Sequence, residues 1–557
     1  MGAWPLMANV SRRGSVIRGI EMIITYQDSK LKIKMGYNPD KIDLIKQVPD
    51  GRKWDKRNRV WELPGTADNI EFLIREFRID SPELAAKLAQ LKSPLRDTDC
   101  GSVVFKTDPY AHQKHGFNLG MNNSKCALFW SMGTGKTWVA INCLEKRIRD
   151  ERVKNALIVC PKSVISSWQR EFEIHGTIKP SIIKSKKPIP PGACLVNYQL
   201  LIFIKEALMA QKWDMIILDE STYIKSTSAK VTKFVWKLVK EIPFRMILTG
   251  TPVTQGCEDL FAQFMALDDG QTFGNSFFTF RNRYFVNRGF AYPDWQLKSG
   301  ALELIREKMK TRSHRITKEQ CLDLPPKNYQ VLEVKMLPAQ AKAYKEIEKE
   351  LLTIIDDVTI AIPYLMTKLI RLSQITSGFI HHDGADIELK HDKLNTLLEI
   401  LQDKPKAVIW CLFRHDINII MTALGNEAVE ISGNTTGEQR GENISRFQNG
   451  DARFLVGQIR AGGIGVTLTA ANFVVYYSQG YSLIDRLQSE DRTHRIGTIG
   501  TVTYVDLVSP KTVDVEILKA IKAKKDVADY VTGDKDLGEI ILNNFRKGLT
   551  SKKQVIY

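Results

Sequence analysis

Short apolar runs alternate with amphipathic stretches along most of this chain, and this alternation restricts the possible fold more than any other feature. The first series of runs comprises CALFW, ALIVC, CLVNY, MIILD and RMILT (126–130, 156–160, 194–198, 215–219, 245–249). Helical patterns such as VAINCLEKRIRD (139–150) separate these runs. Apolar strands that alternate with helices predict βαβ units, in which helices cover a parallel sheet.

A second series follows residue 400, with the apolar runs AVIWCLF, AVEIS, RFLVGQI, FVVYYS and VTYVDLV (407–413, 428–432, 453–459, 473–478, 502–508). Between the two series, residues 271–330 are aromatic and basic with few clear strands, and a long helical stretch covers 342–377. Two tandem α/β sheets are the simplest account. We therefore expect a first lobe at 110–270, a helical protrusion at 271–330, a second lobe at 331–530 and a basic tail at 531–557.

The first part of the chain has a different pattern. Residues 22–36 alternate as strands do, KIDLIKQV (41–48) has helical spacing, VWEL (60–63) reads as a strand, and helices follow up to residue 91. We expect a small α+β domain at 22–80, followed by a linker at 81–109.

Composition narrows the class of protein. The chain has 80 Lys and Arg against 63 Asp and Glu, a net charge of +17, which favours a polyanionic partner. Its eight cysteines are scattered without a CxxC pair, so we expect buried reduced thiols, with neither structural zinc nor disulfides. The uncharged stretch 461–484 contains Asn472 and Gln479, and we interpret it as a buried strand–loop–strand segment instead of a membrane span. These features predict a soluble intracellular protein.

The segment SMGTGKT follows an apolar run directly and precedes a helical pattern. Glycines let a backbone wrap a phosphate group, and the N–H groups at a helix start supply positive potential. We expect Lys136 to reach the β and γ phosphates of ATP and the Thr137 hydroxyl to bind Mg²⁺. Trp130 stands where the strict form of this loop has its first glycine, and the alternative is a glycine-rich turn with an accidental GKT. The predicted phosphate-binding residues are Ser131, Met132, Gly133, Thr134, Gly135, Lys136 and Thr137.

The segment MIILDEST (215–222) places two carboxylates at the end of a buried strand. Asp219 is the candidate ligand for Mg²⁺, and Glu220 is the candidate base for the hydrolytic water. A single Asp-Glu pair after a strand is a weak signal, but its place in the same predicted sheet as Lys136 strengthens it.

The segment QSEDRTHRIG (488–497) carries Arg492 and Arg495 three positions apart. On one helix face they could point at a shared anion and stabilise charge that develops on the γ phosphate. The alternative is a solvated basic helix face.

Further motifs occur in the order typical of one family: LIVCPKSVISSWQREF, ILTGTP, FGNSFFTFRNRYF, RSHRITKEQCLDLPPK, AGGIGVTLTAA and DRTHRIG (157–172, 247–252, 273–285, 312–327, 461–471, 491–497). Across residues 105–530 the chain resembles the Swi/Snf (Snf-like) branch of superfamily-2 helicase-type ATPases, which are double-stranded DNA translocases. The resemblance implies two RecA-like lobes that use ATP and Mg²⁺. Lobes without long insertions are more typical of a bacterial or phage member than of a eukaryotic remodeller.

The resemblance also implies roles for single residues. Gln113 would recognise adenine, and Lys162 would contact DNA. The residues that would couple the ATP site to DNA movement are Thr249, Thr251, Gly463, Gly465 and Gln488. Two positions depart from the family pattern: Thr222 stands where His is usual, and Thr498 stands where Gln is usual. Both departures put the efficiency of coupling in doubt more than hydrolysis itself.

Residues 22–80 resemble, less specifically, the HARP (HepA-related protein) domain of annealing-helicase members. A basic hairpin lies in this region and interleaves cationic and indole side chains, which suit phosphates and exposed bases. Its predicted DNA-binding residues are Arg52, Lys53, Trp54, Lys56, Arg57, Arg59 and Trp61. The alternative is a solvated hairpin whose tryptophans belong to the core.

A second basic concentration, Arg281 to Lys318, contains ten Lys or Arg against three acids. Arg312 and Arg315 lie in the stretch that resembles the helical protrusion of the branch, near which DNA would pass. Either could instead be a structural ion-pair residue.

Together these features predict an ATP-driven motor that moves along double-stranded or forked DNA, with fork remodelling or strand annealing as its outcome. The alternatives are a strand-separating helicase and a non-hydrolysing architectural DNA binder that ATP switches. We expect the protein in the cytoplasm or nucleoid, or in the host cytoplasm for a phage protein. No protein partner is predicted.

Overall fold

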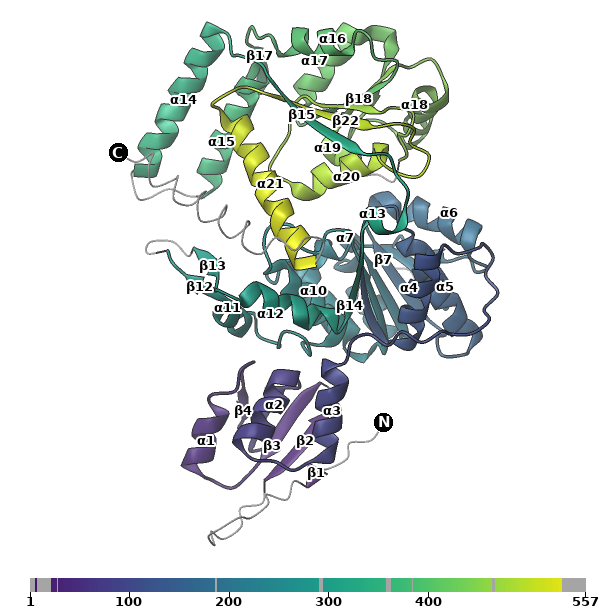
Figure 1. Cartoon of the computed structure of the whole chain (residues 1–557), viewed down its shortest axis with the longest axis vertical. Helices are drawn as coiled ribbons and strands as arrows, with labels where there is room; N and C mark the ends of the chain where they lie inside the picture. The colour runs from purple at the N-terminus through teal and green to yellow at the C-terminus, as the bar shows by residue number, and fades with distance from the viewer. Residues whose placement is uncertain are drawn as a thin grey trace. The chain divides into compact units, whose positions relative to one another are not determined.

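The computed structural model describes residues 6–7, 22–27, 29–185, 188–289, 294–356, 362–382, 384–462 and 466–532. The chain divides into two compact units, and the division falls between Thr317 and Lys318. The first unit holds an N-terminal domain and a seven-stranded sheet, and the second holds a six-stranded sheet (Figure 1). The expected basic tail lies outside the described residues from position 533 onward.

The N-terminal domain has a five-stranded antiparallel sheet in the order β1-β2-β3-β5-β4. Its strands are β1 (Leu6–Met7), β2 (Ile23–Gln27), β3 (Lys30–Lys34), β4 (Lys53–Asp55) and β5 (Val60–Pro64), and its helices are α1 (Pro39–Ile45), α2 (Ala67–Glu76) and α3 (Pro82–Lys92). Alternate strand residues such as Ile24, Leu31 and Ile33 are buried against α2. Leu84 and Leu91 of α3 join the same core. The first part of the expected linker at 81–109 is therefore a helix of this domain.

The first lobe is built on a parallel sheet in the order β14-β6-β11-β10-β7-β9-β8. Its strands are β6 (Lys125–Trp130), β7 (Ala156–Cys160), β8 (Ser181–Ile182), β9 (Ala193–Asn197), β10 (Met215–Asp219), β11 (Phe244–Leu248) and β14 (Ser313–Ile316). All five apolar runs of the first series form strands of this sheet. Strand β14 was not expected, and its polar sequence SHRI explains why, since only Ile316 is buried.

Helices pack on both faces of this sheet (Figure 1). They include α4 (Ala111–Asn122), α5 (Lys136–Arg149), α6 (Ile165–His175), α7 (Tyr198–Leu201), α8 (Lys205–Ala210), α9 (Lys230–Leu238) and α10 (Asp259–Asp268). Neighbouring residues of β6 point to opposite faces: the Phe129 ring lies 6.0 Å from that of Phe264 on α10, whereas Trp130 lies against Gly116 of α4. This alternation inside an unbroken apolar run is typical of a strand covered on both sides.

The segment after α10 contains α11 (Phe277–Tyr284), the hairpin β12 (Phe285–Asn287) and β13 (Trp295–Leu297), and α12 (Ala301–Lys310). The expectation of a helical protrusion at 271–330 is therefore only partly correct. Strand β14 returns from it to the first-lobe sheet, and residues Lys318–Asp526 belong to the second unit.

The second lobe has a parallel sheet in the order β15-β22-β21-β18-β20-β19. Its strands are β15 (Lys327–Glu333), β18 (Ala407–Cys411), β19 (Ala428–Ile431), β20 (Phe454–Gln458), β21 (Phe473–Tyr476) and β22 (Val502–Val508). The helices are α13 (Lys318–Cys321), α14 (Pro338–Asp356), α15 (Ile362–Thr376), α16 (Lys393–Leu401), α17 (Arg414–Leu424), α18 (Gly437–Asn449), α19 (Ile459–Gly462), α20 (Leu483–Thr493) and α21 (Val513–Thr532), with a small hairpin of β16 (Phe379–His382) and β17 (Ala385–Glu388).

Alternate residues of the central strands form two cores, one on each face of this sheet. Ile409, Val475 and Val505 belong to one core, whereas Trp410 and Tyr476 belong to the other. Strand β21 lies inside the uncharged stretch 461–484 and is buried in the sheet. Among the described residues, no helix is both long and apolar enough to cross a membrane.

Candidate nucleotide site and nucleic-acid interface

Three predicted motifs follow three adjacent strands of the first lobe. Strand β11 pairs with β6 on one side and with β10 on the other, and all three are parallel. Their carboxyl ends therefore lie at the same edge of the sheet. The segment SMGTGKT, here called the phosphate loop, follows β6. Asp219 is the last residue of β10 and Glu220 comes directly after it, while Thr249 and Thr251 follow β11. Carboxyl edges of parallel strands are where ligands bind in open α/β sheets.

The phosphate loop has the backbone that its glycines predict. Gly133 and Gly135 have φ of 74° and 85°, in the left-handed region, and α5 begins at Lys136 directly afterwards. A Cβ atom on Gly135 would lie 2.0 Å from Nε2 of Gln113. The Lys136 ammonium donates to the carbonyl oxygens of Trp130 at 2.9 Å and Ser131 at 3.1 Å. This combination of tight backbone, helix start and ammonium group suits phosphate oxygens.

Helix α4 packs over this loop. Gln113 is buried, and its Oε1 accepts from the backbone N–H of Tyr110 at 2.9 Å. A nitrogen of the His112 ring lies 2.8 Å from the carbonyl oxygen of Thr134, and the Tyr110 ring stacks on His112. Tyr110 and His112 were not singled out from the sequence, where a Tyr-Ala-His run carries no distinctive signal.

Asp219 is held by a tryptophan. The buried Trp168 of α6 donates its indole N–H to Oδ2 of Asp219 at 2.8 Å, and the backbone N–H of Glu220 donates to Oδ1 at 3.0 Å. Burial raises the pKa of Asp219, while the Trp168 N–H and the Lys136 charge act in the opposite direction. Both carboxylate oxygens thus have fixed directions, which is how outer-shell groups orient a metal ligand. Thr137 is half-buried at the start of α5.

Glu220 adopts a left-handed backbone with φ of 48°, which is uncommon for a residue with a side chain. The Thr249 hydroxyl donates to Oε2 of Glu220 at 3.3 Å, and the backbone N–H of Thr251 donates to Thr249 Oγ1 at 3.2 Å. The expected coupling segment therefore touches the candidate base directly.

Beneath this segment, Gln263 joins the ends of β10 and β11. It accepts from the Ser221 hydroxyl at 2.6 Å and donates to the carbonyl oxygen of Pro252 at 2.7 Å. Thr222, the residue that departs from the family pattern, is buried beside Ser221.

A chain of hydrogen bonds leads away from Trp130. Its indole N–H donates to Nδ1 of His314 at 3.0 Å, Nε2 of His314 lies 3.3 Å from Nε2 of His115, and Nδ1 of His115 lies 3.2 Å from Asp97. Because an indole only donates, Nδ1 of His314 must accept. Burial lowers the pKa of His314 to about 4, which keeps this acceptor unprotonated at neutral pH. These hydrogen bonds anchor Trp130, the residue that stands where the strict form of the phosphate loop has its first glycine.

In the second lobe, Arg492 is buried in the last turn of α20, whereas Arg495 lies beyond the helix, which ends at Thr493. The expectation that the two share one helix face is therefore wrong. The guanidinium of Arg495 donates to the Thr467 hydroxyl at 3.1 Å. Oγ1 of Thr498 lies 2.6 Å from the carbonyl oxygen of Thr493 and 2.8 Å from that of Arg495, and it accepts from the Arg495 backbone N–H at 3.2 Å. Thr498 thus holds the turn that carries Arg495.

Helix α20 is fixed by a buried ionic network that the sequence did not reveal. Glu490 accepts from Lys327, Tyr329 and Arg486, and Arg486 also donates to Asp506. Burial alone would raise the pKa of Glu490, but Lys327 and Arg486 outweigh it and lower the pKa to about 2. Arg486 and Glu490 are four residues apart on α20, but no sequence spacing could show that Lys327 and Tyr329 of β15 and Asp506 of β22 meet them.

A second anchor of α20 is Lys318, whose buried ammonium donates to Asp491 and to the carbonyl oxygen of His494. The remaining predicted residues are more dispersed. Gln488 is half-buried on α20, Lys162 is exposed directly after β7, and Gly463 and Gly465 lie outside the described residues.

The basic hairpin β4–β5 carries five exposed cations, Arg52, Lys53, Lys56, Arg57 and Arg59. Within the described ranges none of the five forms an ion pair, and the oxygens of Asp55 accept from Arg57 and Asn58 within the turn. Trp54 pairs across the strands with Trp61 at 5.0 Å, but Trp54 remains 40% exposed whereas Trp61 packs on the domain core. Of the two predicted stacking residues, Trp54 has the more accessible ring.

The cations of the second basic concentration are arranged differently. Arg281 pairs with Glu258, Lys310 with Glu307 and Lys318 with Asp491. Arg315 donates to the carbonyl oxygens of Phe129 and Gly250, and Arg312 donates to that of Thr311. Structural contacts therefore account for many of these charges. The contacts of Arg312 and Arg315 are with carbonyl oxygens, and both the DNA contact and the ion-pair role expected for them stay predictions.

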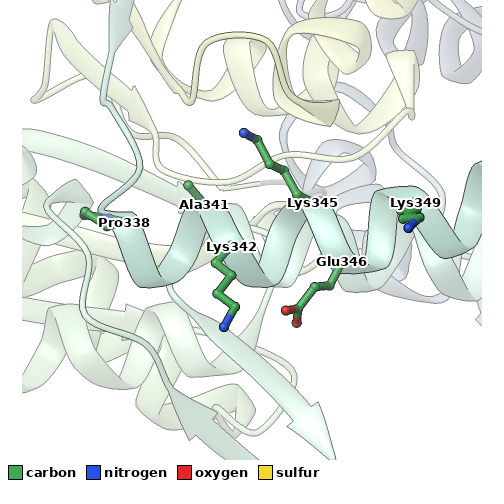
Figure 2. Close-up of a pocket in the computed structure, with 6 residues that line it drawn as sticks. All are labelled: Pro338, Ala341, Lys342, Lys345, Glu346 and Lys349. Atoms are coloured by element: carbon green, nitrogen blue, oxygen red, sulfur yellow. The ribbon is translucent and has the colours of Figure 1, made fainter.

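Two other features bear on ligands. A hollow of about 430 Å³ is lined by Pro338, Ala341, Lys342, Lys345, Glu346 and Lys349, which all belong to α14. Figure 2 shows Lys342 and Glu346 on one side of this helix and Lys345 on the other, so the polar groups do not converge. Among the described residues, no group of three or more His, Cys, Asp or Glu could hold a metal ion by itself.

Comparisons with known proteins agree with this arrangement. The model of the SNF2-related domain matches residues 112–378, and the model of the helicase conserved C-terminal domain matches residues 392–497. A SWI/SNF-related matrix-associated actin-dependent regulator of chromatin subfamily A-like protein 1 homolog of Caenorhabditis elegans is 26% identical over 532 residues, which cover 89% of this chain and 73% of that protein.

The DNA annealing helicase and endonuclease ZRANB3 of Homo sapiens is 27% identical over 446 residues. The match covers 74% of this chain but only 39% of ZRANB3. The SWI2/SNF2 ATPase core of Sulfolobus solfataricus, solved in complex with double-stranded DNA, aligns at 22% identity with a TM-score of 0.39, covering 79% of this chain and 99% of that one. The two family matches occur in the expected order along the chain, which therefore contains an SNF2-related domain followed by a helicase conserved C-terminal domain.

Proposed function

We propose that this protein is a DNA-stimulated ATPase that uses hydrolysis to move along double-stranded or forked DNA. The observation that carries the proposal is the contact between Thr249 and Glu220 at the sheet edge where the phosphate loop also ends. It connects the candidate base directly to the segment expected to couple hydrolysis to movement. The name of ZRANB3, a DNA annealing helicase and endonuclease, supports DNA as the substrate, and the name of the C. elegans relative, a regulator of chromatin, agrees with it.

The residues have separate roles in the proposed reaction. The phosphate loop and Lys136 bind the β and γ phosphates, and Gln113 recognises the adenine. Thr137 and Asp219 would hold Mg²⁺, which supplies positive charge to the phosphates when it is bound. Glu220 orients the attacking water and accepts its proton. Arg492 and Arg495 supply positive charge to the γ phosphate as it leaves.

The N-terminal domain is proposed to be a HARP-like DNA-binding domain. Its antiparallel sheet and its hairpin of exposed cations support this assignment. Strand annealing and fork remodelling belong to the same proposal, as does a location at the nucleoid. Strand separation and ATP-switched binding without hydrolysis are the competing functions.

Phosphate release with and without duplex, forked and single-stranded nucleic acids tests the proposal. Forked or duplex DNA should stimulate hydrolysis more than single-stranded RNA does. The variant Glu220→Gln should bind a fluorescent ATP analogue normally but hydrolyse ATP at least about 100-fold more slowly, the size expected for loss of a general base. Glu241→Gln, at an exposed glutamate of the same lobe, is the matched control.

Absence of hydrolysis in the unmodified protein would support the architectural binder. Displacement of a labelled strand from a duplex would instead support a helicase. Pairing of complementary strands covered by a single-strand-binding protein would support annealing.

A further inference from the structure

The N-terminal domain and the first lobe belong to one compact unit, and four charges lie at their contact. Arg283 of α11 pairs with Asp50 at 2.6 Å and also with Asp68, in the first turn of α2. Lys308 of α12 pairs with Asp68 as well. Asp50 is 2% exposed, and its other carboxylate oxygen accepts from the Thr66 hydroxyl. The two acids come from the N-terminal domain and the two cations come from the first lobe.

The pKa values of Asp68 and Arg283 indicate that their ion pairs outweigh the cost of burial. Burial would raise the pKa of Asp68, but Lys308 and Arg283 lower it below its ordinary value. Burial would lower the pKa of Arg283, but Asp50 and Asp68 raise it. Removal of one partner from such a set leaves an uncompensated charge, which costs more than the loss of an exposed pair.

Close backbone packing accompanies the charges. A Cβ atom on Gly51 would lie 3.1 Å from Oγ1 of Thr279 on α11, and one on Gly274 would lie 3.3 Å from Cβ of Asp50. Gln271 donates to the Ser29 hydroxyl at 2.7 Å. The contact therefore involves the turn before β4 and the β2–β3 turn, in addition to α2.

The connecting segment 93–109 is also attached to the first lobe. Asn123 and Arg96 exchange two hydrogen bonds, and Asn122 donates to the carbonyl oxygen of Thr98 at 2.6 Å. Farther along, Lys106 donates to the carbonyl oxygens of Glu173 and Gly176 at 2.6 and 2.8 Å. The segment is therefore attached to the first lobe near both of its ends and is not a flexible linker.

We propose that the four charges latch the N-terminal domain onto the first lobe, so that the basic hairpin and this lobe engage nucleic acid as one body. Strand β4 begins two residues after Gly51, so the latch lies at the base of the hairpin. The hairpin then keeps its direction relative to the lobe during the ATP cycle. The latch itself does not depend on the proposed function, which supplies only the nucleic acid.

A disulfide across the contact tests the proposal. The built Cβ of Gly51 lies 3.9 Å from Cβ of Thr279, within the range of natural disulfides. Gly51→Cys and Thr279→Cys would be combined in the full chain with Cys100→Ser and Cys321→Ser, because the other six cysteines are buried. Gly51→Ala controls for strain at φ of 89°.

We expect most of the protein to crosslink under mild oxidation, with DNA affinity and DNA-stimulated hydrolysis within about twofold of the reduced form. Failure to crosslink, or a loss of DNA binding that reduction restores, would overturn the latch. A reduced protein that hydrolyses no ATP with DNA would contradict the proposed function instead, while crosslink yield and DNA affinity still report on the latch.

Charge reversal provides a second measurement. Lys308→Glu should accelerate tryptic cleavage after Arg96 at least about tenfold, because an open latch lets the exposed Arg96 leave its two backbone hydrogen bonds with Asn123 and unfold locally into the protease. Lys310→Glu, on the same helix but paired only with the exposed Glu307, should leave the cleavage rate unchanged. Equal rates for the two variants would refute the latch.

Discussion

Single residues of the candidate nucleotide site are held in position by partners that the local sequence does not identify. Trp168 is one of ten tryptophans, and nothing in SSWQREF indicates that its N–H donates to Asp219. The left-handed backbone of Glu220 likewise follows from its surroundings, since Ser221 behind it is tied to Gln263. Thr498, a departure from the family pattern that put coupling efficiency in doubt, holds the turn of Arg495.

Trp168→Phe tests how Asp219 is oriented. The variant keeps a ring in the pocket but removes the N–H donor, so the carboxylate can rotate away from Mg²⁺. We expect the Mg²⁺ concentration for half-maximal binding of a fluorescent ATP analogue to rise about tenfold. Trp236→Phe, which removes a donor to the carbonyl oxygen of Ala262, is the matched control. Identical Mg²⁺ curves for the two variants would show that Trp168 does not orient the carboxylate.

Thr498→Val tests the turn of Arg495. Valine has nearly the same shape but cannot bond to the carbonyl oxygens of Thr493 and Arg495 or to the Arg495 N–H. Loss of these bonds costs about 1–2 kcal/mol, so we expect kcat to fall about tenfold with little change in KM for ATP. Steady-state kinetics measure both constants. Thr501→Val, at an exposed threonine three residues later, should have normal kinetics. A rise in KM alone would assign Thr498 to binding instead.

At the level of elements, the strands with apolar runs were predictable, including the edge strand β19, whereas the edge strands β8, β14 and β15 were not. Every apolar run of both series forms a strand, because a strand covered on both faces needs a continuous apolar sequence. Strands β14 and β15 lie at the sheet edges with mostly polar residues, so their sequences resemble loops. The two basic segments also differ in a way that composition does not show. The hairpin cations face solvent, whereas Arg283 and Lys308 pair with acids that lie 233 and 240 residues away in the chain.

The basic hairpin should therefore carry the salt dependence of DNA binding. Reversal of Lys56 and Arg57 to Glu should remove about two phosphate contacts and reduce the slope of log K against log salt by about 2. Lys46→Glu, in the same domain but paired with Asp43, should leave the slope unchanged. DNA-binding titrations at four salt concentrations measure it. An unchanged slope in the double variant would show that the hairpin is a solvated surface that does not contact DNA phosphates.

At the scale of the whole molecule, the two units have separate cores and should respond separately to pH. Burial raises the pKa of Asp416 in the second lobe from 3.8 to about 7, although the Ser478 hydroxyl donates to it. The folded lobe therefore keeps a proton that the unfolded chain releases. This stabilisation is complete below about pH 4 and is lost as pH rises toward 7.

Relative to Asp416→Asn, the free energy of unfolding of the second lobe should fall by up to roughly 4 kcal/mol from pH 4 to 7. Trp410 is the only tryptophan between residues 318 and 526, so its ¹⁹F signal after labelling with fluorotryptophan follows this lobe alone during urea unfolding. Asp403→Asn, at an exposed aspartate, is the control. If the free energy of unfolding of the second lobe changes equally with pH in the unmodified protein and in Asp416→Asn, the raised pKa of Asp416 is contradicted. First-lobe signals should not differ between them.

The sequence by itself determined the two parallel sheets, the phosphate loop and the carboxylates after β10. These features depend on residues close together in the chain: apolar runs long enough to fill a sheet, and glycines directly before a helix. Only the tertiary structure decided which charges are available for a ligand. Asp50 and Arg283 are 233 residues apart and Lys318 and Asp491 are 173 apart, and no local pattern records that they meet. The net charge of +17 predicted a polyanionic partner. In the folded protein many of the cations pair with acids, whereas those of the basic hairpin stay exposed.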